Sequence, residues 1–434
     1  MPEAARKFYR LLTDEDGEDI CRDISDDACT QQPRNFLRHV LALSGTKTGD
    51  ALMDPKLVLS WLLTTLGAPA HLTGWLVPIR ESGALLPQLF IADRIRNMQR
   101  RKWAWTVGSL VQGLAVAGMA YCAVTLTGQA AGWGILGCLT VFALARSVCS
   151  VTYKDVLGKT IARNTRGTVT GSASAVAAGT ALLFGAILSL PWIDVTASVV
   201  AIALAIGAGL WLTAAGLFAT LAEPAARPSS EERGLGGIAH WLREDSQLRR
   251  FVTVRGLLLG TALAPPYLVA LGGTARSAEM STLGTLGPLV LASASAPLLS
   301  SYQWGRLADR SSRRVLIVAG GIATIVLGLA GAIGMAFPHM LERWWTLPLL
   351  LFGLMVSYQG VRLGRSTHLV DMTDAERRAG YTALSNTLIG FFLVLGGAFG
   401  WLADAYGPAS VLAAFALLSA LATWLGRGLD EVQS

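Results

Sequence analysis

The segment GRLADRSSRRVLIVAGGIATIVLGLAGAIGMAF, residues 305–337, joins a polar stretch to a long apolar run. From Val315 to Phe337 no side chain carries a charge, and most residues are glycine, alanine or branched aliphatic. An α-helix rises about 1.5 Å per residue, so roughly 20 apolar residues cross the hydrocarbon layer of a bilayer, which is about 30 Å thick. The run therefore predicts a membrane-spanning helix that follows a short basic loop.

Apolar runs of this kind recur along the 434 residues, of which 52% are hydrophobic and only 15% are charged. A mean hydropathy of +0.48 excludes an ordinary soluble protein. Twelve spans are predicted, at residues 36–62, 71–93, 103–126, 131–153, 168–190, 195–221, 251–273, 282–304, 314–337, 345–362, 380–402 and 408–426. The predicted fold class is an all-α integral membrane protein of about twelve transmembrane helices.

Basic residues indicate the orientation, because Lys and Arg concentrate in cytoplasmic loops. The five loops assigned to the cytosol hold 22 of them, whereas the outside loops hold only Arg276 and Arg343. Residues 1–34 contain no apolar signal sequence. We therefore predict cytoplasmic termini and a multi-pass protein of the plasma (inner) membrane. The formal net charge of +7 follows from this topology and does not indicate nucleic-acid binding.

The two halves of the chain repeat one another weakly. At one constant offset, Gly45, Gly49, Ala51, Leu52, Pro55, Leu57 and Val58 match Gly256, Gly260, Ala262, Leu263, Pro266, Leu268 and Val269. Such repeats are typical of transporters built from two pseudo-symmetric six-helix bundles. The predicted divisions are a cytoplasmic tail over 1–34, bundles over 35–221 and 251–426, a cytoplasmic linker over 222–250 and a cytoplasmic tail over 427–434.

The loop after span eight has a counterpart after span two. Leu307-Ala308-Asp309-Arg310 matches Ile91-Ala92-Asp93-Arg94, and each is followed by a basic cluster. Residues 305–314 resemble the loop signature of the major facilitator superfamily, although the usual glycine after the Asp-Arg pair is missing. The first copy departs further, with Leu89 in place of the opening glycine.

This resemblance implies a twelve-helix transporter with a cytoplasmic gate. The gate residues that it implies are Asp93, Arg94, Asp309, Arg310 and Arg313. A carboxylate of this kind pairs with Arg and with a neighbouring helix terminus. The alternative is that these charges only keep the loop inside. No subfamily is identified, because the Gly-Pro pair of drug/proton antiporters is absent from residues 179–185 and residues 223–228 resemble the sugar-porter signature only faintly.

Charged residues inside the spans indicate where the chemistry lies, because each costs roughly 2.5 to 3.5 kcal/mol at the membrane centre. Lys47, Asp50 and Asp54 of span one are three and four residues apart, so they share one helical face. That face must line protein or water. Span two adds Arg80 and Glu81 between two prolines, and span four adds Arg146.

We interpret these residues as a polar site for protons and substrate. The predicted proton-coupling residues are Asp50, Glu81 and Asp54, and the predicted substrate-binding residues are Lys47, Arg80, Arg146, Tyr358, Gln359 and Asn386. A carboxylate that exchanges a cationic partner for apolar surroundings changes its proton affinity, which would couple protons to transport. Two alternatives stay open. The charges of spans one, two and four could be fixed ion pairs, and the polar residues of spans ten and eleven could bond neighbouring helices.

The predicted function is secondary active transport of a small organic solute, anionic or zwitterionic, by proton-coupled alternating access. The first alternative is an efflux antiporter for drugs or metabolites, and the second is a non-transporting membrane sensor. An enzyme is not expected, because the five histidines are scattered and no catalytic motif occurs. We expect no cofactor, no metal, five unpaired cysteines and a monomer whose partners are the solute, protons and lipid.

Overall fold

The computed structural model describes residues 24, 26–88, 91, 94–95, 98–225, 244–274, 286–373 and 375–432. Within these ranges the chain forms helices and no strand, which confirms the all-α class. The helices are α2 (Asp26–Leu52), α3 (Val58–Thr65), α4 (Ala70–Gly74), α5 (Leu76–Leu85), α7 (Lys102–Thr125), α8 (Gly128–Thr160), α9 (Arg163–Leu188), α10 (Ala197–Ala219), α12 (Ser246–Leu257), α13 (Gly260–Leu263), α14 (Pro265–Thr274), α15 (Leu286–Arg310), α16 (Ser312–Ala336), the 3-10 helix η3 (Pro338–Glu342), α17 (Thr346–Asp371), α18 (Ala375–Gly396), α19 (Phe399–Tyr406) and α20 (Pro408–Gly426).

Nine helices of the described ranges are long and apolar enough to cross a membrane. They coincide with nine of the predicted spans, so the assignment to an integral membrane protein is confirmed. The other three predicted spans correspond to α2 with α3, to α4 with α5, and to α15. The first two of these are interrupted, and α15 is rich in serine around Pro297. The count of twelve and the cytoplasmic termini stay predictions.

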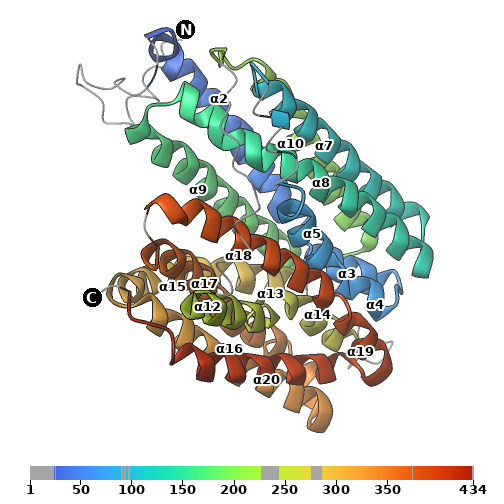
Figure 1. Cartoon of the computed structure of the whole chain (residues 1–434). Helices are drawn as coiled ribbons and strands as arrows, with labels where there is room; N and C mark the ends of the chain where they lie inside the picture. Colours follow the sequence, from blue (N-terminus) through green and yellow to red (C-terminus); the bar gives the residue numbers. More distant parts are fainter. Residues whose placement is uncertain are drawn as a thin grey trace.

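The helices form two groups (Figure 1). Helices α2–α10 lie together in one group, where α7 packs on α8 and α10, and α2 packs on α9 and α10. Helices α12–α20 form the second group, where α16 packs on α17 and α20, and α15 packs on α17. Large side chains fill each interior, including the fully buried Trp211 in the first group and Phe415 in the second. The predicted boundaries of the tails and the linker stay predictions.

Contacts between the two groups join α9 with α15, α3 with α14, α4 with both α14 and α19, and α5 with both α13 and α18. The predicted orientation places α3, α4, α14 and α19 at the outer end. The backbones of α4 and α19 approach closely, since a Cβ added to Gly400 would lie 2.7 Å from Cα of His71. Small residues permit such an approach between helix backbones. The two groups are therefore packed tightly against each other at the predicted outer end.

One expectation about the cysteines is wrong. Cys29 is disulfide-bonded, whereas Cys122, Cys138 and Cys149 are free. The odd count and the absence of a conventional spacing did not reveal this bond.

Candidate functional site

The first helix of each group is interrupted beside a proline. Residues 53–57, which include Asp54 and Pro55, separate α2 from α3, and Pro265 and Pro266 stand at the break between α13 and α14. Proline lacks the N–H that would continue the hydrogen-bond ladder. Pro55 and Pro266 are matched positions of the internal repeat, so a proline lies beside the interruption of the first helix in both halves. Non-helical backbone at membrane depth occurs where it is buried in protein or lines a water-filled cavity.

Asp54 organises the break between α2 and α3. Its carbonyl oxygen accepts hydrogen bonds from the N–H groups of Leu57 at 3.3 Å and Leu59 at 3.1 Å. Its carboxylate Oδ1 accepts the backbone N–H of Lys56 at 2.8 Å. An aspartate that bonds backbone two residues further on stabilises a turn. The turn satisfies the backbone groups that the helix leaves free.

A cavity of about 320 Å³ lies beside this break. The residues that line it are Asp50, Asp54, Pro55, Lys56, Val77, Arg80, Glu81, Tyr358 and Arg362. Tyr358 and Arg362 come from α17 of the second group, and the others come from the first group. The cavity therefore lies between the two groups. Its volume falls at the lower end of small-molecule pockets, which are roughly 300 to 1,000 Å³.

Asp50 is held by two arginines. Its Oδ1 accepts from Nη2 of Arg80 at 3.0 Å, and its Oδ2 lies 2.9 Å from Nη2 of Arg146. The three side chains are 22%, 16% and 30% exposed, so water screens these ion pairs only in part. The guanidinium of Arg80 also lies 5.1 Å from the ring centroid of Phe142. The network ties α2, α5 and α8 together through charge-assisted hydrogen bonds.

Lys56 connects the two groups. Its ammonium lies 3.7 Å from the ring centroid of Tyr358, which is the geometry of a cation–π interaction. Sequence reasoning missed Lys56, because a continuous helix would place it about 180° around the axis from Lys47. The signal that could have found it is Pro55, since a break there removes helical periodicity from the next residue.

Two charged side chains of the cavity have no hydrogen bond or ion pair within the described part of the chain. They are Glu81 on α5, which is half-buried, and Arg362 on α17, which is exposed. They carry opposite charges and belong to different groups. Arg362 is not among the residues that the sequence predicted for this site.

Four predicted substrate-binding residues bond neighbouring helices instead of lining the cavity, and one of them is Arg146, which pairs with Asp50. Lys47 donates to the carbonyl oxygen of Thr170 at 3.3 Å and to the hydroxyl of Ser174, both on α9. Gln359 donates to Ser301 on α15 at 3.4 Å. Asn386 on α18 accepts from Arg255, as described next. Their role toward substrate stays a prediction.

Arg255 is buried and binds neutral side chains. Its Nη2 donates to Asn386 Oδ1 at 2.9 Å, and its Nη1 donates to the hydroxyl of Ser385 at 2.6 Å. The two bonds join α12 to α18. Asn386 is thus engaged within its own group.

The predicted cytoplasmic gate is described only in part. Asp93 lies outside the described residues, and Arg94, Asp309 and Arg310 are exposed. Arg313 pairs with Glu431 at 3.4 Å and donates to the carbonyl oxygen of Leu429 at 3.1 Å. The gate role of these residues stays a prediction.

In each group an acidic residue that follows the last helix binds near the start of the third predicted span, which is α7 in the first group and α16 in the second. Glu431 accepts from the hydroxyl of Ser311, the N-cap of α16, at 2.7 Å. In the first group, Glu223 accepts from the N–H groups of Arg101 at 3.0 Å and Lys102 at 2.8 Å. Glu223 also pairs with Lys159 at 3.4 Å. A carboxylate at a helix N-terminus is favoured by the helix dipole, and sequence reasoning missed both contacts.

A second link between the groups lies at the predicted outer end. The backbone N–H of His71 on α4 donates to Asp404 Oδ1 on α19 at 3.2 Å, and the ring Nδ1 of His71 bonds Oδ2 of Asp404. Trp75 and Trp401 meet beside them edge to face, with ring centroids 6.3 Å apart. Sequence reasoning did not single out this pair, because its members are far apart along the chain.

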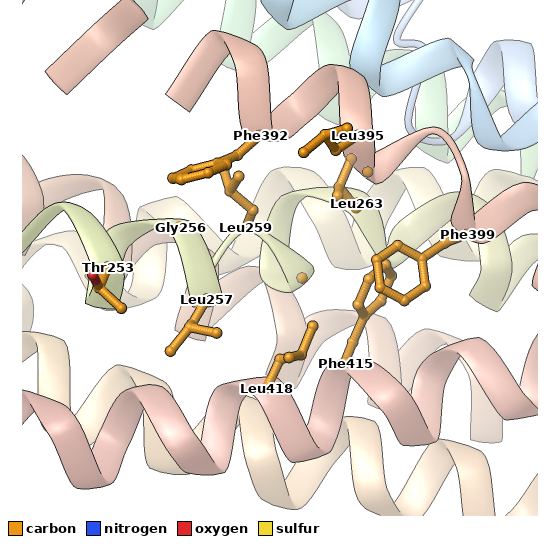
Figure 2. A pocket seen from close by; sticks show the side chains of 12 residues that line it. Thr253, Gly256, Leu257, Leu259, Leu263, Phe392, Leu395, Phe399, Phe415 and Leu418 are labelled. Atoms are coloured by element: carbon orange, nitrogen blue, oxygen red, sulfur yellow. The ribbon is translucent and has the colours of Figure 1, made fainter. Parts of the chain in front are cut away.

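A separate apolar pocket of about 270 Å³ lies within the second group (Figure 2). Figure 2 shows Phe392 and Leu395 of α18 facing Leu418 and Phe415 of α20 across α12 and α13. Thr253 is the one polar side chain among the lining residues. None of the residues predicted for protons or substrate lines this pocket, which offers van der Waals contact rather than charge.

Comparison of the sequence with known proteins finds a partial match. No protein-family model matches the chain. A multi-drug resistance efflux pump PmrA homolog from Lactococcus lactis subsp. lactis (strain IL1403) is 31% identical over 167 residues. The match covers 37% of this chain and 37% of that protein, so it spans well under half of either.

Solved structures share the fold at low sequence identity. The nucleoside transporter NupG is 12% identical with a TM-score of 0.65, over 91% of this chain and 98% of that one. A D-xylose-proton symporter is 12% identical with a TM-score of 0.67, over 92% and 98% of the two chains. A POT family transporter in complex with a thioalcohol-conjugated peptide is 12% identical with a TM-score of 0.67, over 90% and 95%. At this identity the likeness establishes the architecture.

Proposed function

This chain has the fold of the major facilitator superfamily, and from that premise we propose that it is a secondary transporter of a small organic solute, coupled to protons. The observation that carries the proposal is the charged cavity between the two helix groups, beside the break in α2 and α3. Charges inside a membrane are costly and face a bundle interior or a water-filled path. Sites of this kind at the interface of two repeats are where secondary transporters bind their solutes.

Transport by alternating access requires that one end of the cavity closes while the other opens. The contacts of α3 with α14 and of α4 with α19 support a closed outer end. The link between His71 and Asp404 supports the same state. We assign this conformation to the inward-facing side of the cycle.

Asp50 is the proposed coupling carboxylate, with Arg80 and Arg146 as its charge partners. When Asp50 is ionised, two guanidiniums hold it at 3.0 and 2.9 Å. When it takes up a proton, both ion pairs weaken and the contacts between α2, α5 and α8 loosen. Protonation of one side chain therefore changes how three helices of the first group are held together.

The test uses purified protein in liposomes with a pH-sensitive dye trapped inside. Solutes are added outside, in separate sets of anions, zwitterions and cationic drugs. A symporter carries protons inward with the solute and acidifies the lumen. Asp50→Asn is expected to abolish the signal while the protein stays folded, and Glu342→Gln, which removes an exposed acid of η3, is the matched control. A solute-dependent signal that persists in Asp50→Asn removes Asp50 from the mechanism.

The second candidate is efflux of drugs or metabolites in exchange for protons. The partial similarity to a multi-drug resistance efflux pump homolog favours it, as does the apolar pocket in Figure 2. The same assay separates the two by sign. An antiporter exports protons as solute enters, so apolar drugs added outside would make the lumen alkaline.

A further inference from the structure

The charged side chains that line the cavity are balanced in number. Three are acids, Asp50, Asp54 and Glu81, and three are bases, Lys56, Arg80 and Arg362. Arg146 does not line the cavity, but it adds a fourth base to the cluster through its ion pair with Asp50. The charge of the ligand therefore depends on which lining side chains are left without a hydrogen bond or ion pair.

Four of these six side chains are already engaged. Asp50 binds Arg80, Asp54 accepts the N–H of Lys56, and Lys56 lies on the ring of Tyr358. Glu81 and Arg362 are the two that have no hydrogen bond or ion pair to any described residue. The cavity thus offers one acid and one base to a ligand.

Tyr358 lies close to the available base. Tyr358 and Arg362 are four residues apart on α17, so they share one face of the helix with Cβ atoms roughly 5 to 6 Å apart. Glu81 faces the same cavity from α5 in the other group. An aromatic face, a carboxylate and a guanidinium therefore surround one small volume.

We infer that the cavity binds a small zwitterion that carries an ammonium and a carboxylate, such as an amino acid. Arg362 takes the carboxylate, because a guanidinium matches its two oxygens with parallel N–H donors. Glu81 and the Tyr358 ring take the ammonium. This inference rests on the proposed transport function and narrows its substrate class.

Lys56 shows that the Tyr358 ring accepts an ammonium. Its Nζ lies 3.7 Å from the ring centroid, and it belongs to the turn that interrupts α2 and α3. The substrate ammonium competes with Lys56 for the same aromatic face. Binding then breaks a contact that joins the two helix groups, which supplies a reason for the groups to move when substrate arrives.

The test measures binding rather than transport, so it does not depend on proton coupling. Purified protein in detergent is titrated with the twenty amino acids and with glycine betaine, and thermal unfolding is followed by intrinsic fluorescence. Each amino acid that raises the melting temperature is compared with its N-acetyl derivative, an anion, and its methyl ester, a cation. We expect the zwitterion to bind at least tenfold more tightly than either derivative, because each loses one charged partner.

Two variants test which side chain binds the ammonium of the ligand and which binds its carboxylate. Glu81→Gln is expected to weaken zwitterion binding about tenfold or more while the N-acetyl derivative is unaffected, and Arg362→Gln is expected to do the same while the methyl ester is unaffected. Glu342→Gln and Arg343→Gln remove exposed charges in the predicted outer loop and should change nothing. Arg362 is itself exposed, so its replacement tests the inference even where Glu81→Gln does not fold.

Two results overturn the inference. One is that no zwitterion binds, or that a derivative with a net charge binds as tightly as its parent. The other is that both variants bind the zwitterion as the unaltered protein does. If zwitterions bind but the liposome assay gives no proton signal, the coupling proposal fails and the substrate class stands. If protons move with solutes that are not zwitterions, the substrate class fails and transport stands.

Discussion

The close approach of α4 and α19 predicts the effect of adding one methyl group at Gly400. A Cβ there would lie 2.7 Å from Cα and 2.8 Å from the carbonyl oxygen of His71, where ordinary contact begins at 3.4 Å. Both neighbouring atoms belong to the backbone, so α19 must move away from α4 by about 0.7 Å. Overpacking of this kind costs roughly 1 to 3 kcal/mol.

Only the conformation with a closed outer end bears this cost. In an outward-open conformation α4 and α19 are apart, and the added methyl group meets nothing. Gly400→Ala is therefore expected to shift the equilibrium toward the outward-open state by roughly 5- to 150-fold. Gly216→Ala on α10 is the matched control, because a Cβ there has no neighbour within 4 Å and both changes favour helix equally.

Spin labels measure the shift. Gln129 and His339 are exposed and belong to the predicted outer loops of the two groups, so a label on each reports the opening of the outer end. In pulsed dipolar spectroscopy, a larger fraction of Gly400→Ala molecules than of unaltered molecules is expected to show the longer distance between the two labels. The reasoning is refuted if Gly400→Ala and Gly216→Ala give the same distribution.

Other contacts give three further predictions. Asp404→Asn weakens the link to His71, so the same spin-label distances should lengthen, whereas unchanged distances would exclude this pair as an outer latch. Glu223→Gln removes the negative charge that accepts two N–H groups at the start of α7. The melting temperature in detergent should fall by an amount that corresponds to roughly 1 to 2 kcal/mol of stability. An unchanged melting temperature would show that the contact is dispensable. Lys56→Met removes the competitor from the Tyr358 ring and should raise the affinity for zwitterions by about 2- to 30-fold in titrations, and a fall in affinity would contradict the competition.

Much of the fold follows from local composition. The apolar runs predicted nine of the spanning helices, and the resemblance of the Asp-Arg loops predicted the fold that solved transporters share. The matched prolines of the repeat, Pro55 and Pro266, lie at matched breaks in the structure. Local composition succeeds because lipid imposes the same requirement on every spanning segment, which is to be apolar and to satisfy its backbone within a helix.

Much of the candidate site was also within reach of the sequence. Asp50, Asp54, Arg80, Glu81 and Tyr358 were predicted there and line one cavity. The cost of a charge in hydrocarbon singled out the four charged residues, because none of them could face lipid. Their roles in coupling and binding stay proposals.

The pairing of these charges was not within reach of the sequence. Asp50 could have bound Lys47, which shares its helical face, yet it binds Arg80 and Arg146 from two other helices. Lys47 instead bonds the carbonyl oxygen of Thr170 on α9. Helical spacing orders the residues of one helix and says nothing about the distance to another.

The sequence by itself determined that the chain crosses the membrane and which charged residues cannot face lipid. It also predicted that the basic loops lie on the cytoplasmic side. Each of these depends on a residue and its neighbours along the chain. The tertiary structure alone decided that Lys56 meets Tyr358, that His71 meets Asp404, and that Glu81 and Arg362 form no hydrogen bond or ion pair with any described residue. Such contacts join helices of different groups, and they depend on packing between segments that sequence spacing does not bring together.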